Sequence, residues 1–80
     1  MQAPSIADIE EWNTEQLIQH LQAKFPDDIS NTALNILKEQ EIEGVAFLRL
    51  TEEDLMSYGM KCGPASVIAG YVEELIGMYP

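Results

Sequence analysis

The chain contains one cysteine and one histidine that could serve nucleophilic or acid–base chemistry. Cys62 follows Lys61 and precedes an expected helix N-terminus, a setting that can make a thiol reactive. A nucleophile also needs a base within hydrogen-bond reach. His20 belongs to a different segment, and no motif links it to Cys62. We therefore predict an ordinary semi-buried cysteine, a histidine at the flank of a helix, no catalytic residues and no enzymatic activity.

Oxygen ligands for a metal ion gather in two places, residues 27–31 (Asp-Asp-Ile-Ser-Asn) and residues 51–54 (Thr-Glu-Glu-Asp). Neither group has the spacing of a calcium loop, with glycine at the sixth position and glutamate at the twelfth. One cysteine and one histidine cannot complete a zinc site. We interpret both groups as helix caps and predict no metal and no other cofactor.

Charge is the strongest bulk property. The 80 residues include 14 acidic and 4 basic side chains, which give a net charge of −10. Such a field repels phosphate backbones and anionic lipid headgroups and attracts basic partners. We therefore expect a protein partner, with no nucleic acid and no membrane.

Length and cysteine content indicate one small domain in a reducing compartment. Eighty residues support a single modest core. Every apolar run is interrupted by charge, so no transmembrane helix is predicted. The N-terminus has no signal-peptide pattern, and a lone cysteine allows no internal disulfide. We expect an intracellular protein, cytoplasmic or nuclear.

Local signals in the first half predict three helices. Asn13 with Gln16 forms a capping box for the first, and Pro26 ends it. A second helix follows residues 27–31 and runs to about Gln40. A short third helix at about residues 43–48 is expected to bury Ile42, Val45 and Leu48.

Two further helices are predicted in the second half. Thr51 caps the fourth with Asp54, and Gly59 ends it. The fifth opens at Gly63-Pro64, with proline at the first helical position. Its apolar stripe recurs at spacings of three and four: Ala65, Ile68, Ala69, Val72, Leu75, Ile76 and Tyr79. We predict an all-α fold, a compact five-helix bundle with a long C-terminal helix, over residues 12–79, with residues 1–11 as a lead-in that is partly ordered at most.

The order of these signals resembles the sterile alpha motif (SAM) domain, a family of interaction modules. The family has a tryptophan before helix one, isoleucine–acid–glycine before helix three, a capped acidic start to helix four, glycine–aliphatic after it, and a glycine opening helix five. These places are filled here by Trp12, Ile42-Glu43-Gly44, Leu50-Thr51-Glu52-Glu53-Asp54-Leu55, Gly59-Met60 and Gly63. The resemblance covers about residues 12–77.

The resemblance implies a protein–protein interaction module, expected to be part of a larger signalling or scaffold protein. Family members commonly join head to tail, so that a mid-loop surface on one copy meets an end-helix surface on the next. The mid-loop surface would here comprise Glu39, Glu41, Glu43, Arg49, Glu52, Glu53 and Asp54. The end-helix surface would comprise Met60, Lys61, Gly63, Pro64, Ser66, Val67 and Tyr71.

The end-helix surface departs from the pattern of many members. Those members carry glycine–histidine–arginine–any–lysine at the start of helix five, whereas Pro64, Ala65 and Val67 stand here in place of the charges. We therefore predict hetero-association, in which the acidic mid-loop surface receives another SAM domain with a basic end-helix surface. Homotypic head-to-tail oligomerisation is the alternative. RNA binding, which some members show, is not expected because only Lys61 lies near the start of helix five.

Overall fold

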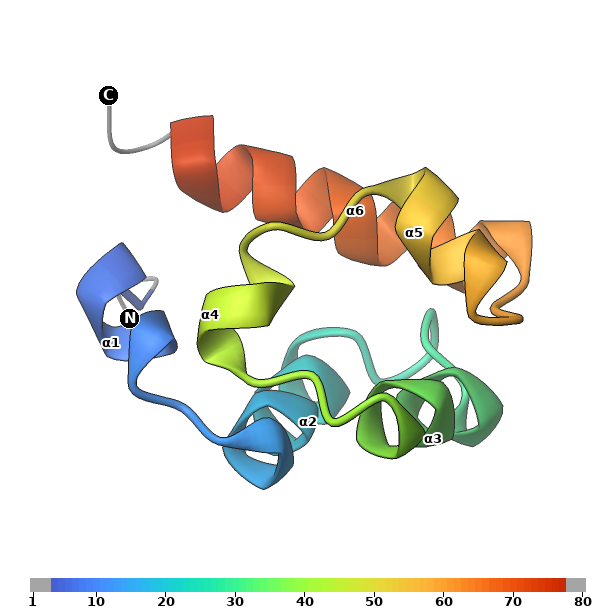
Figure 1. Ribbon diagram of the computed structural model, residues 1–80, viewed down its shortest axis with the longest axis horizontal. Coiled ribbons are helices and arrows are strands. Elements are labelled where there is room, and N and C mark those ends of the chain that lie inside the picture. Colours follow the sequence, from blue (N-terminus) through green and yellow to red (C-terminus); the bar gives the residue numbers. More distant parts are fainter. Residues whose placement is uncertain (1–3, 78–80) are drawn as a thin grey trace.

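The computed structural model describes residues 4–77, and the helices of this part of the chain are joined by turns and irregular segments, with no strand among the described residues (Figure 1). The helices are α1 (Ile6–Glu10), α2 (Thr14–Lys24), α3 (Asn31–Glu39), α4 (Gly44–Phe47), α5 (Glu52–Ser57) and α6 (Cys62–Gly77). The predicted all-α class with a long C-terminal helix is confirmed.

The helices pack in pairs around a shared interior. Helix α5 lies along α6, α2 lies against α3, and α1 lies against α4. In Figure 1, α4 occupies the space between the α2–α3 pair and α6. The bundle measures 30 × 22 × 22 Å.

Every helix contributes to one hydrophobic core. The largest fully buried side chains are Phe47, Ile9, Leu17, Leu21, Leu37, Leu55, Ile68 and Leu75. Burying a side chain of this size stabilises a fold by about 1.5–3 kcal/mol. Helices α1 to α5 have 11 residues or fewer and are too short to be stable alone, so this common core holds them in place.

The starts predicted for α2, α3 and α5 are confirmed by their capping hydrogen bonds. The Asn13 side chain accepts from the Gln16 N–H at 2.8 Å, and the Gln16 side chain accepts from the Asn13 N–H at 3.0 Å. Thr51 and Asp54 exchange the equivalent bonds at 3.1 and 3.2 Å. Ser30 caps α3 by accepting from the Ala33 N–H. These bonds satisfy donors that have no partner inside the helix.

Helices α3 and α5 end in the same motif but with different residues at its left-handed position. After α5, the Met60 N–H donates to the Leu55 carbonyl, and Gly59 has a φ of 101°. After α3, the Ile42 N–H donates to the Leu37 carbonyl, and Glu41 has a φ of 53°. Glycine adopts this conformation without strain, whereas it costs a residue with a Cβ about 1–2 kcal/mol.

Helix α1 was missed by the sequence analysis, so residues 4–77 form six helices where five were predicted. Ser5 and Asp8 form a capping box around its start. Ile9 is fully buried in the core, which ties the segment 6–10 to the bundle. The Ser-x-x-Asp signature was present in the sequence. A five-residue helix shows the helical spacing of apolar residues only once, however, here from Ile6 to Ile9. This is too little periodicity for a helix to be recognised.

The predicted packing around α4 is confirmed for Ile42, which is buried, and partly for Leu48, which is half-buried, but it was wrong for Val45. Val45 is 47% exposed, and Phe47 is fully buried in its place. A helix of one turn has no sustained periodicity, so the larger apolar side chain takes the interior position.

Helix α6 begins slightly earlier than predicted, at Cys62, so Pro64 occupies the third helical position and not the first. A missing N–H is tolerated there too, because the first four N–H groups of a helix have no internal acceptor. Ile76 was assigned to the buried stripe but is 48% exposed. Tyr79 lies outside the described residues.

Candidate functional site

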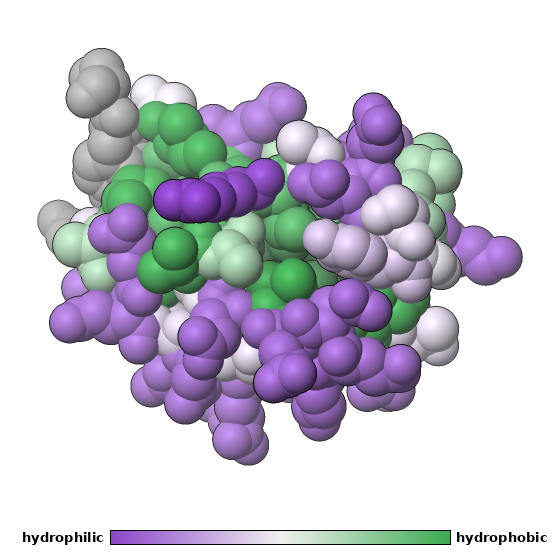
Figure 2. All heavy atoms as spheres, in the orientation of Figure 1, coloured by the Kyte–Doolittle hydropathy of each residue, from purple (hydrophilic) through white to green (hydrophobic). Residues whose placement is uncertain are grey.

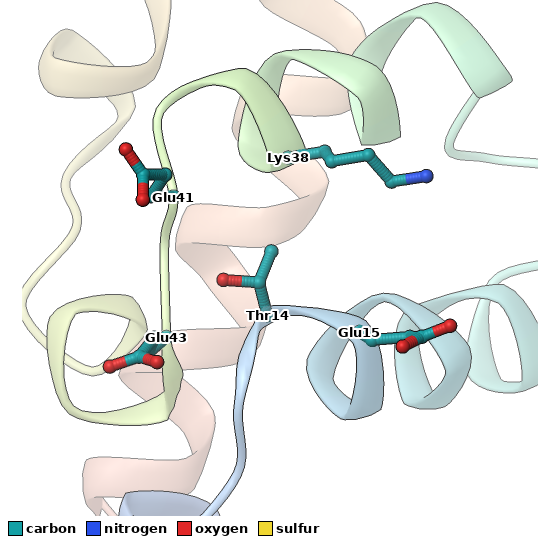
Figure 3. A pocket seen from close by; sticks show the side chains of 5 residues that line it. All are labelled: Thr14, Glu15, Lys38, Glu41 and Glu43. Carbon is teal, nitrogen blue, oxygen red and sulfur yellow. The ribbon is translucent and has the colours of Figure 1, made fainter.

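An acidic depression of about 520 Å³ lies between the start of α2 and the α3–α4 connection (Figure 3). We define the acidic depression by its lining residues, which are Thr14, Glu15, Lys38, Glu41 and Glu43. In Figure 3 the Lys38 amine points away from Glu41 and Glu43, so it does not neutralise them directly. The Glu15 carboxylate extends to the same side as Lys38, so the lining holds three carboxylates and one amine, with Glu41 and Glu43 on the side away from the amine.

Backbone geometry positions these carboxylates. The Gly44 N–H donates to the Trp12 carbonyl at 3.0 Å, which joins the first residue of α4 to the residue that precedes the N-cap of α2. The left-handed conformation of Glu41 turns the chain sharply after α3. Glu41 and Glu43 consequently lie opposite the first turn of α2, which carries Glu15.

Sequence analysis missed the contribution of α2 to this site. Thr14, Glu15 and Lys38 were not among the predicted mid-loop residues. Glu15 is more than twenty residues from Glu41 in the chain, and no local pattern connects the two. Only the packing of α2 against α3 brings them together.

The predicted mid-loop residues do not line one common depression. Glu41 and Glu43 line the acidic depression, whereas Arg49 and Glu52 line a second one beside α6. In Figure 1 the α3–α4 and α4–α5 connections leave α4 on opposite sides. The remaining members, Glu39, Glu53 and Asp54, line neither depression.

The predicted end-helix surface needs a larger correction. Met60 and Tyr71 are only 4% exposed and belong to the core. Met60 also lines a small depression together with Lys61 and Pro64. Both lie where the chain packs inward: Met60 follows the Gly59 turn, and Tyr71 packs near Phe47 with ring centroids 6.2 Å apart. Of the remaining residues, Lys61, Gly63 and Ser66 are exposed, and Pro64 and Val67 are half-buried.

His20 lies in an aromatic cluster that joins α2 to α6. Its Nε2 shares a 2.6 Å hydrogen bond with the Tyr71 hydroxyl. The centroid of its ring lies 4.8 Å from the centroid of the Trp12 ring. Lys24 places its Nζ 5.3 Å from the centroid of the Tyr71 ring, a cation–π distance. Burial, and then the Glu74 carboxylate, raise the pKa of Tyr71, so its hydroxyl stays protonated. The predicted helix-flank histidine is thus part of an interhelical contact.

This cluster makes stability depend on pH. Burial is the main cause that lowers the pKa of His20 from its ordinary 6.5, and the nearby Lys24 cation lowers it further. The unfolded chain therefore binds more protons than the folded chain just below pH 6.5. It follows that the free energy of unfolding is highest above that pH and falls as the pH drops through the folded pKa. We expect this decrease in urea denaturation between about pH 7.5 and about pH 5.5, above the usual carboxylate range.

The matched variant for this prediction is His20→Gln, which keeps a polar side chain but does not titrate. Its free energy of unfolding should lack the decrease between the two pH values. An equal decrease in the variant would show that His20 is not its source.

The two residues considered for nucleophilic chemistry are held apart. His20 bonds to Tyr71, and Tyr71 is nine residues along α6 from Cys62, or about 13 Å of helix. Cys62 is exposed, contrary to the prediction of a semi-buried residue, and its thiol donates to a Glu52 carboxylate oxygen 3.7 Å away. This arrangement provides no nucleophile–base pair.

Metal binding and membrane insertion were also considered for residues 4–77. Within this range, no group of three histidine, cysteine or acidic side chains is arranged to hold a metal ion. None of the helices in the described part of the chain has the length and apolar character needed to cross a bilayer.

Comparison with known families supports the resemblance seen in the sequence. A family model described as a SAM-like domain matches residues 1–74, a range that includes α1. Domains of this kind are generally protein-interaction modules and not enzymes. No solved structure matches the chain at a significant level. Because the family model covers more than half of the chain, this protein belongs to the family of SAM-like domains.

Proposed function

We propose that this SAM-like domain associates with a different protein, and that the acidic depression receives a basic surface of that partner. A SAM-like domain with a basic end-helix surface is the partner that fits best. The observation that carries the proposal is the grouping of Glu15, Glu41 and Glu43 around one hollow that has a single amine.

Two further features support a hetero-association. A net charge of −10 makes copies of the chain repel one another and speeds encounter with cationic partners. The chain's own end-helix region offers one exposed lysine, Lys61, as a basic counterpart. Met60 and Tyr71 are largely buried and supply no cation.

The strained position of Glu41 is also consistent with a binding role. A glycine at this left-handed position would stabilise the turn, as Gly59 does after α5. Strained residues often occur where a side chain serves function. Glu41 adds a carboxylate to the acidic depression at a cost of about 1–2 kcal/mol in backbone strain.

Charge reversal in the acidic depression should weaken binding. We expect Glu43→Lys to lower the affinity about tenfold, mainly through slower association, with a smaller loss at high salt. The probe is a SAM-like domain that carries the glycine–histidine–arginine–any–lysine pattern, measured by surface plasmon resonance at several salt concentrations. Glu41→Gly should also weaken binding while raising the free energy of unfolding by about 1 kcal/mol, which separates lost affinity from lost folding.

The matched control is Asp28→Lys, which makes the same change in net charge on the exposed α2–α3 loop. Equal losses in Glu43→Lys and Asp28→Lys would contradict a localised site and leave only the overall charge. Sedimentation velocity tests the homotypic alternative: a mass that grows with protein concentration, and grows further with salt, would favour self-assembly over hetero-association.

A further inference from the structure

The second depression is a groove between α6 and the α4–α5 connection, with a volume of about 390 Å³. We call it the α6 groove. Its lining residues are Leu48, Arg49, Leu50, Thr51, Glu52, Ser66, Ala69, Gly70, Val72, Glu73 and Ile76. None of them lines the acidic depression, so the two sites are structurally separate.

The α6 side of the groove is unusually open for the middle of a helix. Ser66, Gly70 and Glu73 follow one another at spacings of four and three, and all three are exposed. A Cβ built on Gly70 would meet no atom within 4 Å. Another helix can therefore approach the α6 backbone closely at this point.

The groove also has an apolar component, part of which is exposed among the described residues. Leu50 and Val72 are buried at its base. Ile76 is 48% exposed at one end, and Leu48 is half-buried. Figure 2 shows hydrophobic surface over α4 and the C-terminal half of α6, crossed by one strongly hydrophilic side chain and bordered by others. Burying such side chains against a partner would gain about 25 cal/mol of free energy for each Å² of apolar surface removed from water.

The charged groups of the groove limit what can fill it. Glu52 and Glu73 supply carboxylates, and Arg49 supplies the single cation. A second copy of this chain, with 14 acidic and 4 basic side chains, would bring mostly like charge to the two carboxylates. A complementary partner carries basic residues opposite Glu52 and Glu73 and one acidic residue opposite Arg49.

We infer that the α6 groove is a second docking site, and that its occupant is an amphipathic helix of another protein. Aliphatic side chains of this helix pack on Leu48 and Ile76, and its backbone crosses α6 at Gly70. Lysine or arginine residues beside the aliphatic seam face Glu52 and Glu73. The lined part of α6, from Ser66 to Ile76, spans about 15 Å, which fits roughly three turns of a docked helix.

A synthetic peptide tests this inference directly. The probe is a side-chain-stapled helix with leucines at spacings of three and four, two flanking lysines and one glutamate. In ¹H–¹⁵N NMR titrations we expect its amide shift changes to centre on Arg49, Gly70 and Glu73. A second peptide of equal charge, with serine in place of leucine, should bind at least about tenfold more weakly, since it has lost the apolar contacts.

Gly70→Leu is the informative protein variant, because it fills the groove where the fold has room for a side chain. It should lower peptide affinity at least about tenfold, whereas Gly63→Leu, which also meets no atom within 4 Å but lies outside the groove, should change it less than about twofold. Circular dichroism melting checks that both variants fold.

Three results would overturn the inference. The first is no detectable binding at about 1 mM peptide, which corresponds to a binding free energy weaker than about 4 kcal/mol. The second is an unchanged peptide affinity in the Gly70→Leu variant. The third is a set of amide shift changes centred on Glu15, Glu41 and Glu43. Glu43→Lys should leave peptide binding nearly unchanged, so failure of the α6 groove and failure of the acidic depression give different patterns.

Discussion

Gly44→Ala should destabilise the fold by about 3 kcal/mol or more, the largest effect we expect from adding a single methyl group. A Cβ at this position would overlap the carbonyl oxygen of Ile9 and lie 2.8 Å from its carbonyl carbon. Both atoms belong to the backbone of α1, so no side-chain rotation can relieve the overlap. Helix α1 would have to leave α4, which would expose Ile9.

Chemical denaturation measures this loss directly. The free energy of unfolding of an 80-residue domain is roughly 4–12 kcal/mol, so the variant loses a large part of it. Because each kcal/mol shifts the melting temperature of a domain of this size by about 4–8 °C, the melting temperature should be lower by more than about 12 °C. Gly70→Ala is the control, because it adds the same methyl group to a helix where no atom lies within 4 Å. That control should gain about 0.5–1 kcal/mol. A stable Gly44→Ala variant would show that α1 does not dock on α4 as described.

Phe47→Ala should cost about 3–5 kcal/mol, because it leaves a cavity in the centre of the core. Phe47 is fully buried and lies near Tyr71, with ring centroids 6.2 Å apart. Urea denaturation followed by circular dichroism measures the change in the free energy of unfolding.

Val45→Ala is the matched comparison, two residues earlier in the same short helix. Val45 is 47% exposed, so its truncation should cost well under about 1 kcal/mol. Were Val45→Ala the more damaging change, the helix would face the core as the sequence analysis predicted, and not as the structure shows.

Helix starts and stops were largely predictable from the sequence. Capping depends on residues three apart in the chain, as with Asn13 and Gln16 or Thr51 and Asp54, so a local pattern identifies it. The stop at Gly59 depends on one residue's freedom to adopt a positive φ. Family membership could also be inferred, since the motifs that carry the resemblance are these same local signals.

Which side chains are buried was harder to predict from the sequence. The buried state of Tyr71 depends on His20, Phe25 and Phe47, which come from two other segments of the chain, α2 with its C-cap and α4. Helical periodicity alone placed Tyr71 beside the main apolar stripe of α6, at a site open to a partner. Its core position follows from aromatic neighbours that periodicity cannot reveal.

The sequence by itself determined the all-α class, the capped helix starts and the strongly acidic character, because each depends on composition or on residues close together in the chain. Only the tertiary structure decided which carboxylates share a surface. It joined Glu15 to Glu41 and Glu43, and separated Arg49 and Glu52 into the α6 groove. The physical reason is that long-range packing of α2 on α3 and of α5 on α6 sets those neighbours, and such contacts depend on the whole core.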